Sequence, residues 1–309
     1  MSDLKLFRLG AGSVVEVPGT AVALEKSLQS LIEANLEAFL GVRFLATEFS
    51  TGKQHGGRMD TLGLDENGFP VIIEYKRSTN ENVINQGLFY LDWLMDHKRD
   101  FEWLALERFG GEIAKAVDWS SPRLICIAGD FTKYDEHAVK QMDRNIELIR
   151  YRRYGDDLLL FELVNATTTS SATNAAAPAG DAGTGSRSRA ARGTVSQYLE
   201  DAPSDLRDLF EALKAHLVAL GDDVQVKTLK NYFAFKRIKN FACVEVHNRT
   251  RNLLVYVKVD PDSLELEEGF TRDVRNIGHF GTGDLEITLR SFEDMKRTLS
   301  LIELSYESS

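Results

Sequence analysis

The chain has few cysteines and no long apolar run, which argues against a disulfide-rich protein and against a membrane-spanning one. Only two cysteines occur among 309 residues, Cys126 and Cys243, far apart in apolar, strand-like runs. We therefore expect buried thiols in a reducing, cytoplasmic compartment, without disulfides or a zinc site. No stretch approaches the roughly 18 apolar residues of a membrane helix. The opening residues, MSDLK, lack the basic start and apolar core of a signal peptide, so we expect no membrane partner.

Positive charge is also in short supply. With 37 Lys and Arg against 47 Asp and Glu, the formal net charge is −10, which argues against avid, indiscriminate binding of nucleic acid. This balance still permits a nuclease whose basic residues are local. The apolar content of 43% and charged content of 27% are typical of a globular protein, and the length suits two domains.

The most informative stretch is GGRMDTLGLDENGFPVIIEYKR, residues 56–77. It contains two strand-like runs, residues 59–64 and 70–77, around a polar turn that ends in Asn-Gly, and this pattern predicts a hairpin. Strand alternation places Glu74 and Lys76 on one face and Tyr75 on the other, while Asp60 lies on the neighbouring strand. The apolar run before Glu74 predicts a buried central strand, where charged groups are costly.

The carboxylates of this hairpin predict a cation. Two carboxylates about 5 Å apart repel by roughly 3 kcal/mol at an effective dielectric near 20. Lys76 supplies one positive charge beside Asp60 and Glu74, and a divalent metal would supply the rest. The alternative is a structural hairpin with a surface Glu-Lys pair, because so short a pattern recurs by chance.

The surroundings of the hairpin carry a resemblance to a known superfamily. Asp60, thirteen residues and then Glu74-Tyr75-Lys76 resemble the PD-(D/E)XK nuclease motif, with Met59 where the motif's name has proline. A helix is predicted over residues 80–98, and it carries Gln86 and Tyr90 four positions apart on one face. A Gln-x-x-x-Tyr helix after the E-x-K strand recurs in RecB-like and NucS-like nucleases. From the helix alone, the favoured interpretation is that Tyr90 is core and Gln86 incidental; the position of the helix after Lys76 favours the functional one instead.

The resemblance implies a fold and an activity for residues 1–165. It implies an α/β, restriction-endonuclease-like mixed sheet flanked by helices, of the NucS-related kind. The implied activity is that of an endonuclease that hydrolyses phosphodiester bonds with Mg²⁺ or Mn²⁺. The implied partner is nucleic acid, with DNA favoured over RNA. The resemblance leaves the oligomeric state undecided between a monomer and a homodimer.

The resemblance also implies roles for particular side chains. The metal ligands would be Asp60, Glu74, the backbone carbonyl of Tyr75, and Glu25 from the amphipathic helix predicted over residues 21–40. Glu25 is favoured over Glu33, whose neighbours place it nearer the solvated face; Glu25 could also be a first-turn residue that stabilises the helix. The catalytic set would be Glu25, Asp60, Glu74 and Lys76. The residues expected to contact nucleic acid are Lys53, Arg58, Gln86 and Tyr90.

The rest of the chain divides into a linker and a second domain. Residues 166–194 are of low complexity and predict a flexible linker. Residues 195–309 predict a separate α+β domain that resembles an uncharacterised C-terminal domain found after such nuclease-like domains and sometimes labelled a predicted transport protein. The elements expected there are helices at 205–220 and 292–306, a helix or turn at 227–235, a hairpin over 241–259 and a strand at 285–289.

Two basic segments leave alternatives open. Lys227, Lys230, Lys236, Arg237 and Lys239 are interleaved with aromatics, which suits either a nucleic-acid surface or a segment that buries its aromatics. Three arginines on the hairpin over residues 146–164 could lie on a solvated edge or face DNA. The alternative function for the whole chain is a catalytically silent nucleic-acid-binding or protein-interaction module that keeps the nuclease fold.

Overall fold

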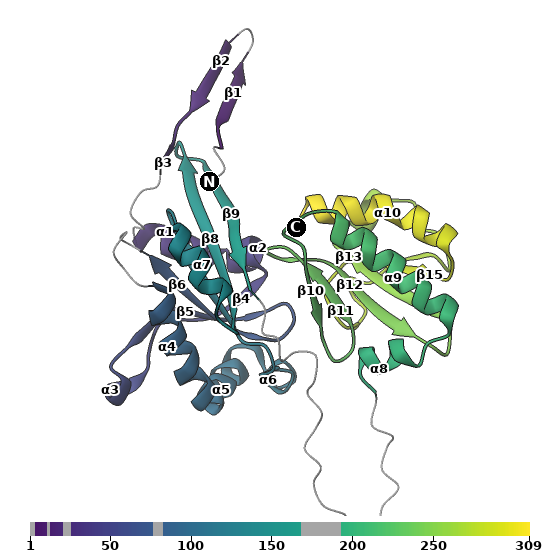
Figure 1. Ribbon diagram of the computed structural model, residues 1–309, viewed down its shortest axis with the longest axis horizontal. Coiled ribbons are helices and arrows are strands. Elements are labelled where there is room, and N and C mark those ends of the chain that lie inside the picture. Colours follow the sequence, from purple (N-terminus) through teal and green to yellow (C-terminus); the bar gives the residue numbers. More distant parts are fainter. Residues whose placement is uncertain (1–3, 11–12, 21–25, 77–82, 168–192) are drawn as a thin grey trace, which may run out of the picture. The chain divides into compact units, whose positions relative to one another are not determined.

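A computed structural model describes residues 4–10, 13–20, 26–76, 83–167 and 193–309 (Figure 1). The side chains of Ser27, Gln54 and Lys76 are outside this description. The chain divides into two compact units, residues 1–170 and 171–309, and each has its own sheet. No helix in the described part is both long and apolar enough to cross a bilayer.

The N-terminal unit is built on a seven-stranded mixed sheet ordered β3-β8-β7-β6-β5-β4, with β9 paired to β8. Its strands are β3 (Gly19–Thr20), β4 (Val42–Ser50), β5 (Arg58–Asp65), β6 (Pro70–Lys76), β7 (Arg123–Ala128), β8 (Asn145–Tyr154) and β9 (Leu158–Ala166). The pairs β6–β7 and β7–β8 are parallel and the others antiparallel. A separate hairpin joins β1 (Leu6–Gly10) to β2 (Ser13–Val17).

Helices pack on both faces of this sheet. They are α1 (Lys26–Ala34), α2 (Leu36–Leu40), α3 (Gly52–His55), α4 (Val83–Asp96), α5 (Lys98–Phe109), α6 (Gly111–Lys115) and α7 (Lys133–Lys140). Buried residues of α4 and α5 share an apolar cluster with β5, β6 and β7. The closest approach is at Gly87 of α4, where an added Cβ would lie 2.4 Å from Leu124 Cδ1. Glycine there lets α4 lie against the centre of the sheet.

A buried ion triad joins three strands at the end of the sheet where β6 and β7 begin. Arg123, the first residue of β7, donates two hydrogen bonds to Glu147 of β8 at 2.9 and 2.8 Å, and one to Asp65 of β5 at 2.7 Å. The carboxylates raise the pKa of the Arg123 guanidinium against the opposing effect of burial. Asp65 also accepts the amides of Asn67 and Phe69, so it orders the β5–β6 turn.

The C-terminal unit is an α+β layer pair. Its six strands run β10-β11-β12-β13-β15-β14: β10 (Gln225–Thr228), β11 (Phe233–Lys236), β12 (Asn240–His247), β13 (Asn252–Val257), β14 (Thr271–Asp273) and β15 (Leu285–Leu289). The helices are α8 (Val195–Glu200), α9 (Ser204–Ala219) and α10 (Phe292–Glu307). Alternate residues of β12, β13 and β15 join residues of all three helices in one apolar cluster, as expected for a sheet covered on one face.

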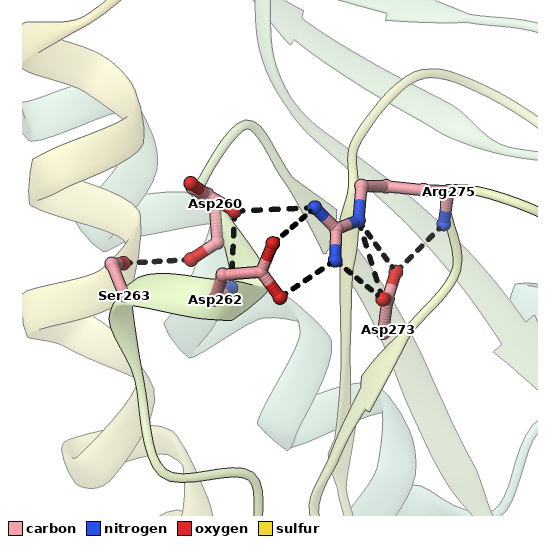
Figure 2. Close-up of polar contacts among 5 residues, drawn as sticks. All are labelled: Asp260, Asp262, Ser263, Asp273 and Arg275. Carbon is pink, nitrogen blue, oxygen red and sulfur yellow. Dashed lines mark hydrogen bonds and ion pairs between the residues drawn. The ribbon is translucent and has the colours of Figure 1, made fainter.

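An arginine clamp closes one corner of this unit (Figure 2). Arg275 donates to Asp262 at 2.8 and 2.9 Å, and to Asp273 at distances from 2.8 to 3.2 Å. Its hydrogen bonds lower the pKa values of the Asp262 and Asp273 carboxyls. These groups are exposed to solvent, so the clamp joins the end of β14 to the 3-10 turn Pro261–Ser263 without a large gain in stability.

The predicted fold class is confirmed: a mixed α/β sheet flanked by helices, and a distinct α+β unit with its own sheet. One element prediction is wrong and another is right only in part. The helix expected over residues 21–40 is two helices, because the backbone leaves the helical region at Asn35, and its start at 21–25 lies outside the described residues. Of residues 227–235, expected as a helix or turn, only 229–232 form a turn, closed by a hydrogen bond from the Leu229 amide to the Tyr232 carbonyl, and the rest belong to β10 and β11.

Candidate functional site

Asp60 and Glu74 lie side by side where the β5–β6 ladder ends. The last backbone pair is Thr61 with Ile73, and the next position on each strand is one of these acids. There the carboxylates replace the backbone acceptors. The Asp60 amide donates to Glu74 Oε1 at 3.1 Å, and the Tyr75 amide donates to Asp60 Oδ2 at 3.0 Å. Both carboxylates are therefore held against the same few backbone atoms at the carboxyl end of β6.

Glu74 is almost fully buried, with 1% of its surface exposed. Burial first, and then the charge of Asp60, raise the pKa of Glu74 to about 9, although the Asp60 amide acts in the opposite direction. At neutral pH this carboxyl therefore keeps a proton unless a cation stabilises its charged form. A buried carboxyl with so shifted a pKa is typical of functional sites, although ion-pair networks can also produce one.

A cleft of about 660 Å³ opens beside these acids. Its lining includes Asp60 and Tyr75 from the hairpin, and Gln86 and Tyr90 from α4. The other lining residues come from the end of β4, from α3, from the two glycines after it and from the start of β5: Ser50, Gly52, Lys53, Gly56, Gly57 and Arg58. The cleft thus combines a carboxylate and two cations with the neutral hydrogen-bonding side chains of Ser50, Gln86 and Tyr90.

The Tyr90 hydroxyl organises one wall of the cleft. It accepts the Arg58 amide at 3.1 Å and Gln86 Nε2 at 3.3 Å. Its ring rests on Gly57, where an added Cβ would lie 2.5 Å from Tyr90 Cε1. The backbone of Gly57 is fixed in turn by Thr51, whose side chain exchanges hydrogen bonds with it at 2.9 and 3.0 Å. The contact between α4 and the start of β5 therefore depends on Tyr90.

A second polar network lies on the opposite face of the same strands. Oε1 of Glu33 on α1 accepts hydrogen bonds from Thr61 at 2.6 Å, Thr47 at 2.9 Å and Gln29 at 3.1 Å. The Tyr75 hydroxyl lies 3.4 Å from the Thr61 hydroxyl. The prediction that Glu33 faces solvent is therefore wrong, because polar partners on β4 and β5 hold it against the sheet. The pairing of Gln29 with Glu33, four positions apart, was the only local signal of this network.

The structure brings together most of the residues predicted for the site, and two lie beyond its description. Lys53, Arg58, Asp60, Tyr75, Gln86 and Tyr90 line one cleft, and Glu74 adjoins it. Glu25 lies outside the described residues. Lys76 is the last residue of β6, but its side chain is not described. One residue that the sequence reasoning missed is Glu48, which pairs with Arg58 at 2.7 Å and has a left-handed φ of 51°.

The donor set fits a hard divalent cation. Asp60 and Glu74 offer carboxylate oxygens, which suit Mg²⁺ or Mn²⁺. Mg²⁺ usually keeps several water ligands and needs only one or two protein carboxylates. Within the described ranges no group of three or more His, Cys, Asp or Glu side chains could hold a metal. The pair at the cleft is thus a minimal set, to which Glu25 and the Tyr75 carbonyl are proposed additions.

Comparison with known proteins adds a match for the C-terminal unit. Residues 195–309 match a family described as "Domain of unknown function (DUF5655)". An uncharacterised protein of Haemophilus influenzae is 29% identical over 302 residues, which are 97% of this chain and 98% of that protein. A chain from the EndoMS-dsDNA2 complex is 20% identical, with a TM-score of 0.25 over 42% of this chain and 46% of that chain. A TM-score this low does not establish a shared fold.

The basic residues of the matched C-terminal unit are buried only in part. Lys227 and Lys236 are 7% and 2% exposed, whereas Lys230 is exposed, and Phe233 and Phe235 belong to the apolar core. Of the two interpretations of this segment, the structure favours the one in which the aromatics are buried. The glycine-rich loop over residues 278–284 lies on the other face of the sheet, where the Thr282 amide donates to the sulfur of Cys243 at 3.4 Å.

One arginine of β8, Arg150, differs from both alternatives. Arg150 is 3% exposed and pairs with Asp130 and Glu162, each at 3.0 Å. It is neither on a solvated edge nor free to face DNA, because β8 has β7 on one side and β3 and β9 on the other. Arg153 is exposed and reaches Asp156 at 3.5 Å.

Proposed function

We propose that this chain is a divalent-metal-dependent nuclease that hydrolyses phosphodiester bonds in nucleic acid, with DNA favoured over RNA as the substrate. The observation that supports the proposal is the pairing of Asp60 with the buried Glu74 at a cleft that also carries Lys53 and Arg58. A carboxyl with a pKa of about 9 is costly to ionise in the protein alone, so its position at a cleft favours a role in binding a cation.

The charged and polar residues at the cleft have distinct roles in this proposal. Asp60, Glu74 and the Tyr75 carbonyl would hold the cation, and Glu25 would complete its shell directly or through water. Mg²⁺ or Mn²⁺ bound there would supply a water of lowered pKa and a positive charge against the phosphate. Lys76 belongs to the same strand face as Glu74 by alternation. Its ammonium orients the attacking water or stabilises the transition state.

The cleft wall positions the nucleic-acid strand. Lys53 and Arg58 meet phosphate groups, and the exposed Gln86 adds amide hydrogen bonds. In the described contacts the Tyr90 hydroxyl accepts two hydrogen bonds, so its own proton can be donated to a phosphate oxygen. The wall thus supplies both charge and directed donors next to the carboxylates.

Cleavage and metal binding together test the proposal. The substrates are plasmid, single-stranded, branched and mismatched DNA, and matched RNA, each with Mg²⁺ or Mn²⁺. Asp60→Asn should abolish cleavage and weaken Mn²⁺ binding measured by calorimetry, while Asp157→Asn on the exposed β8–β9 turn should match the parent. Lys76→Ala should keep Mn²⁺ binding and raise the barrier to cleavage by about 2 to 4 kcal/mol, the usual effect of removing one preorganised charge stabiliser.

Two outcomes would contradict the proposal. Undiminished cleavage by Asp60→Asn would show that the activity does not use this cleft. A parent protein that retains nucleic acid but cleaves no substrate with either metal would instead indicate a catalytically silent binding module.

A further inference from the structure

Next to the cleft lies a row of aromatic rings, which we call the aromatic strip: His55, Phe89, Trp93 and His97. The Trp93 and His97 rings are stacked at 4.0 Å with an interplanar angle of 9°. His55, the last residue of α3, lies 5.9 Å from the Phe89 ring and 6.0 Å from the His97 ring. The strip therefore joins α3 to α4 through ring contacts, although its two halves are far apart in sequence.

The strip continues the wall of the cleft. Gln86 and Tyr90, which line the cleft, share a face of α4 with Trp93 because their spacing is four and then three residues. Phe89 lies 5.8 Å from the Tyr90 ring. On the α3 side, the cleft residues Lys53 and Gly56 flank His55 in sequence. A strand that meets the cations of the cleft would therefore pass directly beside the strip.

Only the outer members of the strip are open to solvent. Phe89 is 47% exposed and Trp93 is 6% exposed. His97 is held from behind by Trp93, whose carbonyl lies 2.8 Å from His97 Nδ1. The half-exposed ring of Phe89 has the rings of His55 and Tyr90 beside it. A half-exposed phenyl ring, which has only two rotatable side-chain bonds, provides a flat apolar surface at a modest cost in conformational entropy.

The ligand that suits such a surface is a nucleobase that has left its stack. In a duplex the base faces are covered by neighbouring bases, so an aromatic side chain can stack only on a base that is unpaired or splayed out. Lys53 and Arg58 in the adjoining cleft carry the charge that a phosphate backbone requires. Phosphate contacts together with aromatic stacking are the general features of single-strand binding.

We propose that Phe89, with His55 beside it, stacks on an unpaired base, so that the substrate is single-stranded or carries an unstacked nucleotide near the cleft. That the stacked base lies next to catalytic residues rests on the proposed function, whereas the stacking itself does not. The stacking surface thereby selects strands with unpaired bases over a fully paired duplex.

Binding to a fluorescent DNA tests this assignment without cleavage. The probe is a single-stranded oligodeoxynucleotide that contains 2-aminopurine, a base whose emission falls when it stacks. It is titrated with the full chain in Ca²⁺, and a fully paired duplex of the same sequence is titrated in parallel. The variants are Phe89→Leu, which removes the ring, Phe89→Tyr, which keeps it, and Tyr134→Leu, a control at an exposed aromatic residue of α7.

The parent should quench the 2-aminopurine and bind the single strand more tightly than the duplex. Phe89→Leu should lose the quenching and bind the single strand about 5- to 150-fold more weakly, the range expected for one base–aromatic stack. Its duplex affinity should be unchanged. Phe89→Tyr and Tyr134→Leu should match the parent in both measurements.

Three outcomes would overturn the assignment: unquenched emission in the parent complex, equal single-strand binding by parent and Phe89→Leu, or equal losses in the Tyr134→Leu control. Should Phe89→Leu fail to fold, the quenching by the parent and by Phe89→Tyr still decides. Cleavage in Mg²⁺ is scored separately. A parent that cleaves without quenching refutes the stacking alone, and a parent that quenches without cleaving refutes the nuclease alone.

Discussion

Replacing Glu74 with glutamine should stabilise the metal-free protein, although it removes a group at the proposed centre of activity. Burial and the charge of Asp60 raise the pKa of Glu74 from 4.5 to about 9. Between these values the folded chain keeps a proton that the unfolded chain has released. The free energy of unfolding therefore falls as pH rises through this window, by about 1.4 kcal/mol per pH unit. Glutamine does not titrate, and its Oε1 can still accept the Asp60 amide.

The size of the effect follows from the width of the window below the working pH. At pH 7.5, three pH units above the unfolded value, Glu74→Gln should be more stable than the parent by up to about 4 kcal/mol. Well below pH 4.5 the two should be equally stable, because Glu74 is then protonated in both the folded and the unfolded state. The stability difference should therefore grow with pH and level off above pH 9.

Urea unfolding followed by tryptophan emission is suited to this measurement. The three tryptophans, at positions 93, 103 and 119, all lie in the N-terminal unit, so the signal reports that unit alone. Glu107→Gln, an exposed change on α5, serves as the matched control and should follow the parent at every pH. A Glu74→Gln variant that is less stable than the parent, or whose advantage does not change with pH, would refute the reasoning.

Added Mn²⁺ should narrow the difference in stability between Glu74→Gln and the parent. When the free cation concentration is 100 times the dissociation constant, binding adds about 2.7 kcal/mol to the free energy of unfolding of the parent. Glu74→Gln should gain little, because it lacks the second carboxylate. Because binding must displace the Glu74 proton, the affinity of the parent for Mn²⁺ should weaken as pH falls below 9.

Two further substitutions test the framework around the site by the same tryptophan-detected unfolding. Arg123→Gln should lower the free energy of unfolding by about 3 to 5 kcal/mol, because it leaves two buried carboxylates without their cation. A loss of only about 1 kcal/mol, which is the usual effect of a point mutation, would contradict this. Gly57→Ala should cost about 1 to 3 kcal/mol, since its Cβ would lie 2.5 Å from Tyr90 Cε1. Gly111→Ala, whose Cβ would meet only Leu106 at 3.8 Å, is the control and should be close to neutral.

Strands with strong local patterns were predicted almost residue by residue. The apolar run at 285–289 coincides with β15. The runs around the Asn-Gly turn match β5 and β6 to within one residue at each described end. Such elements are set by alternation and turn chemistry, which act over a few neighbours. The predicted spacing of Asp60 and Glu74 was informative for the same reason, because a hairpin of known register places two residues opposite each other.

The errors arise where the environment of a side chain is set by partners that are distant in sequence. Arg150 is buried because Asp130 and Glu162 neutralise it, and no local pattern reveals an ion pair across the sheet. Glu33 was placed nearer the solvated face because Gln29 and Glu37 are its neighbours on the helix, yet Thr47 and Thr61 of the sheet donate hydrogen bonds to it. The aromatic strip was missed because His55 meets its partners only after α3 and α4 come together. Polar or aromatic partners from other elements thus limit inference from one sequence.

The two ends of the central strands treat buried carboxylates differently, and this difference bears on the proposed function. At one end Glu147 receives two hydrogen bonds from Arg123, so its charge is balanced within the fold. At the other end burial and a neighbouring acid raise the pKa of Glu74 to about 9, so that near neutral pH the metal-free fold is more stable with the proton in place. A fold optimised for stability alone would carry an amide or an apolar residue at this position. Retaining a carboxyl there, beside Asp60 and an open cleft, is physically reasonable if the site gains a cation in use.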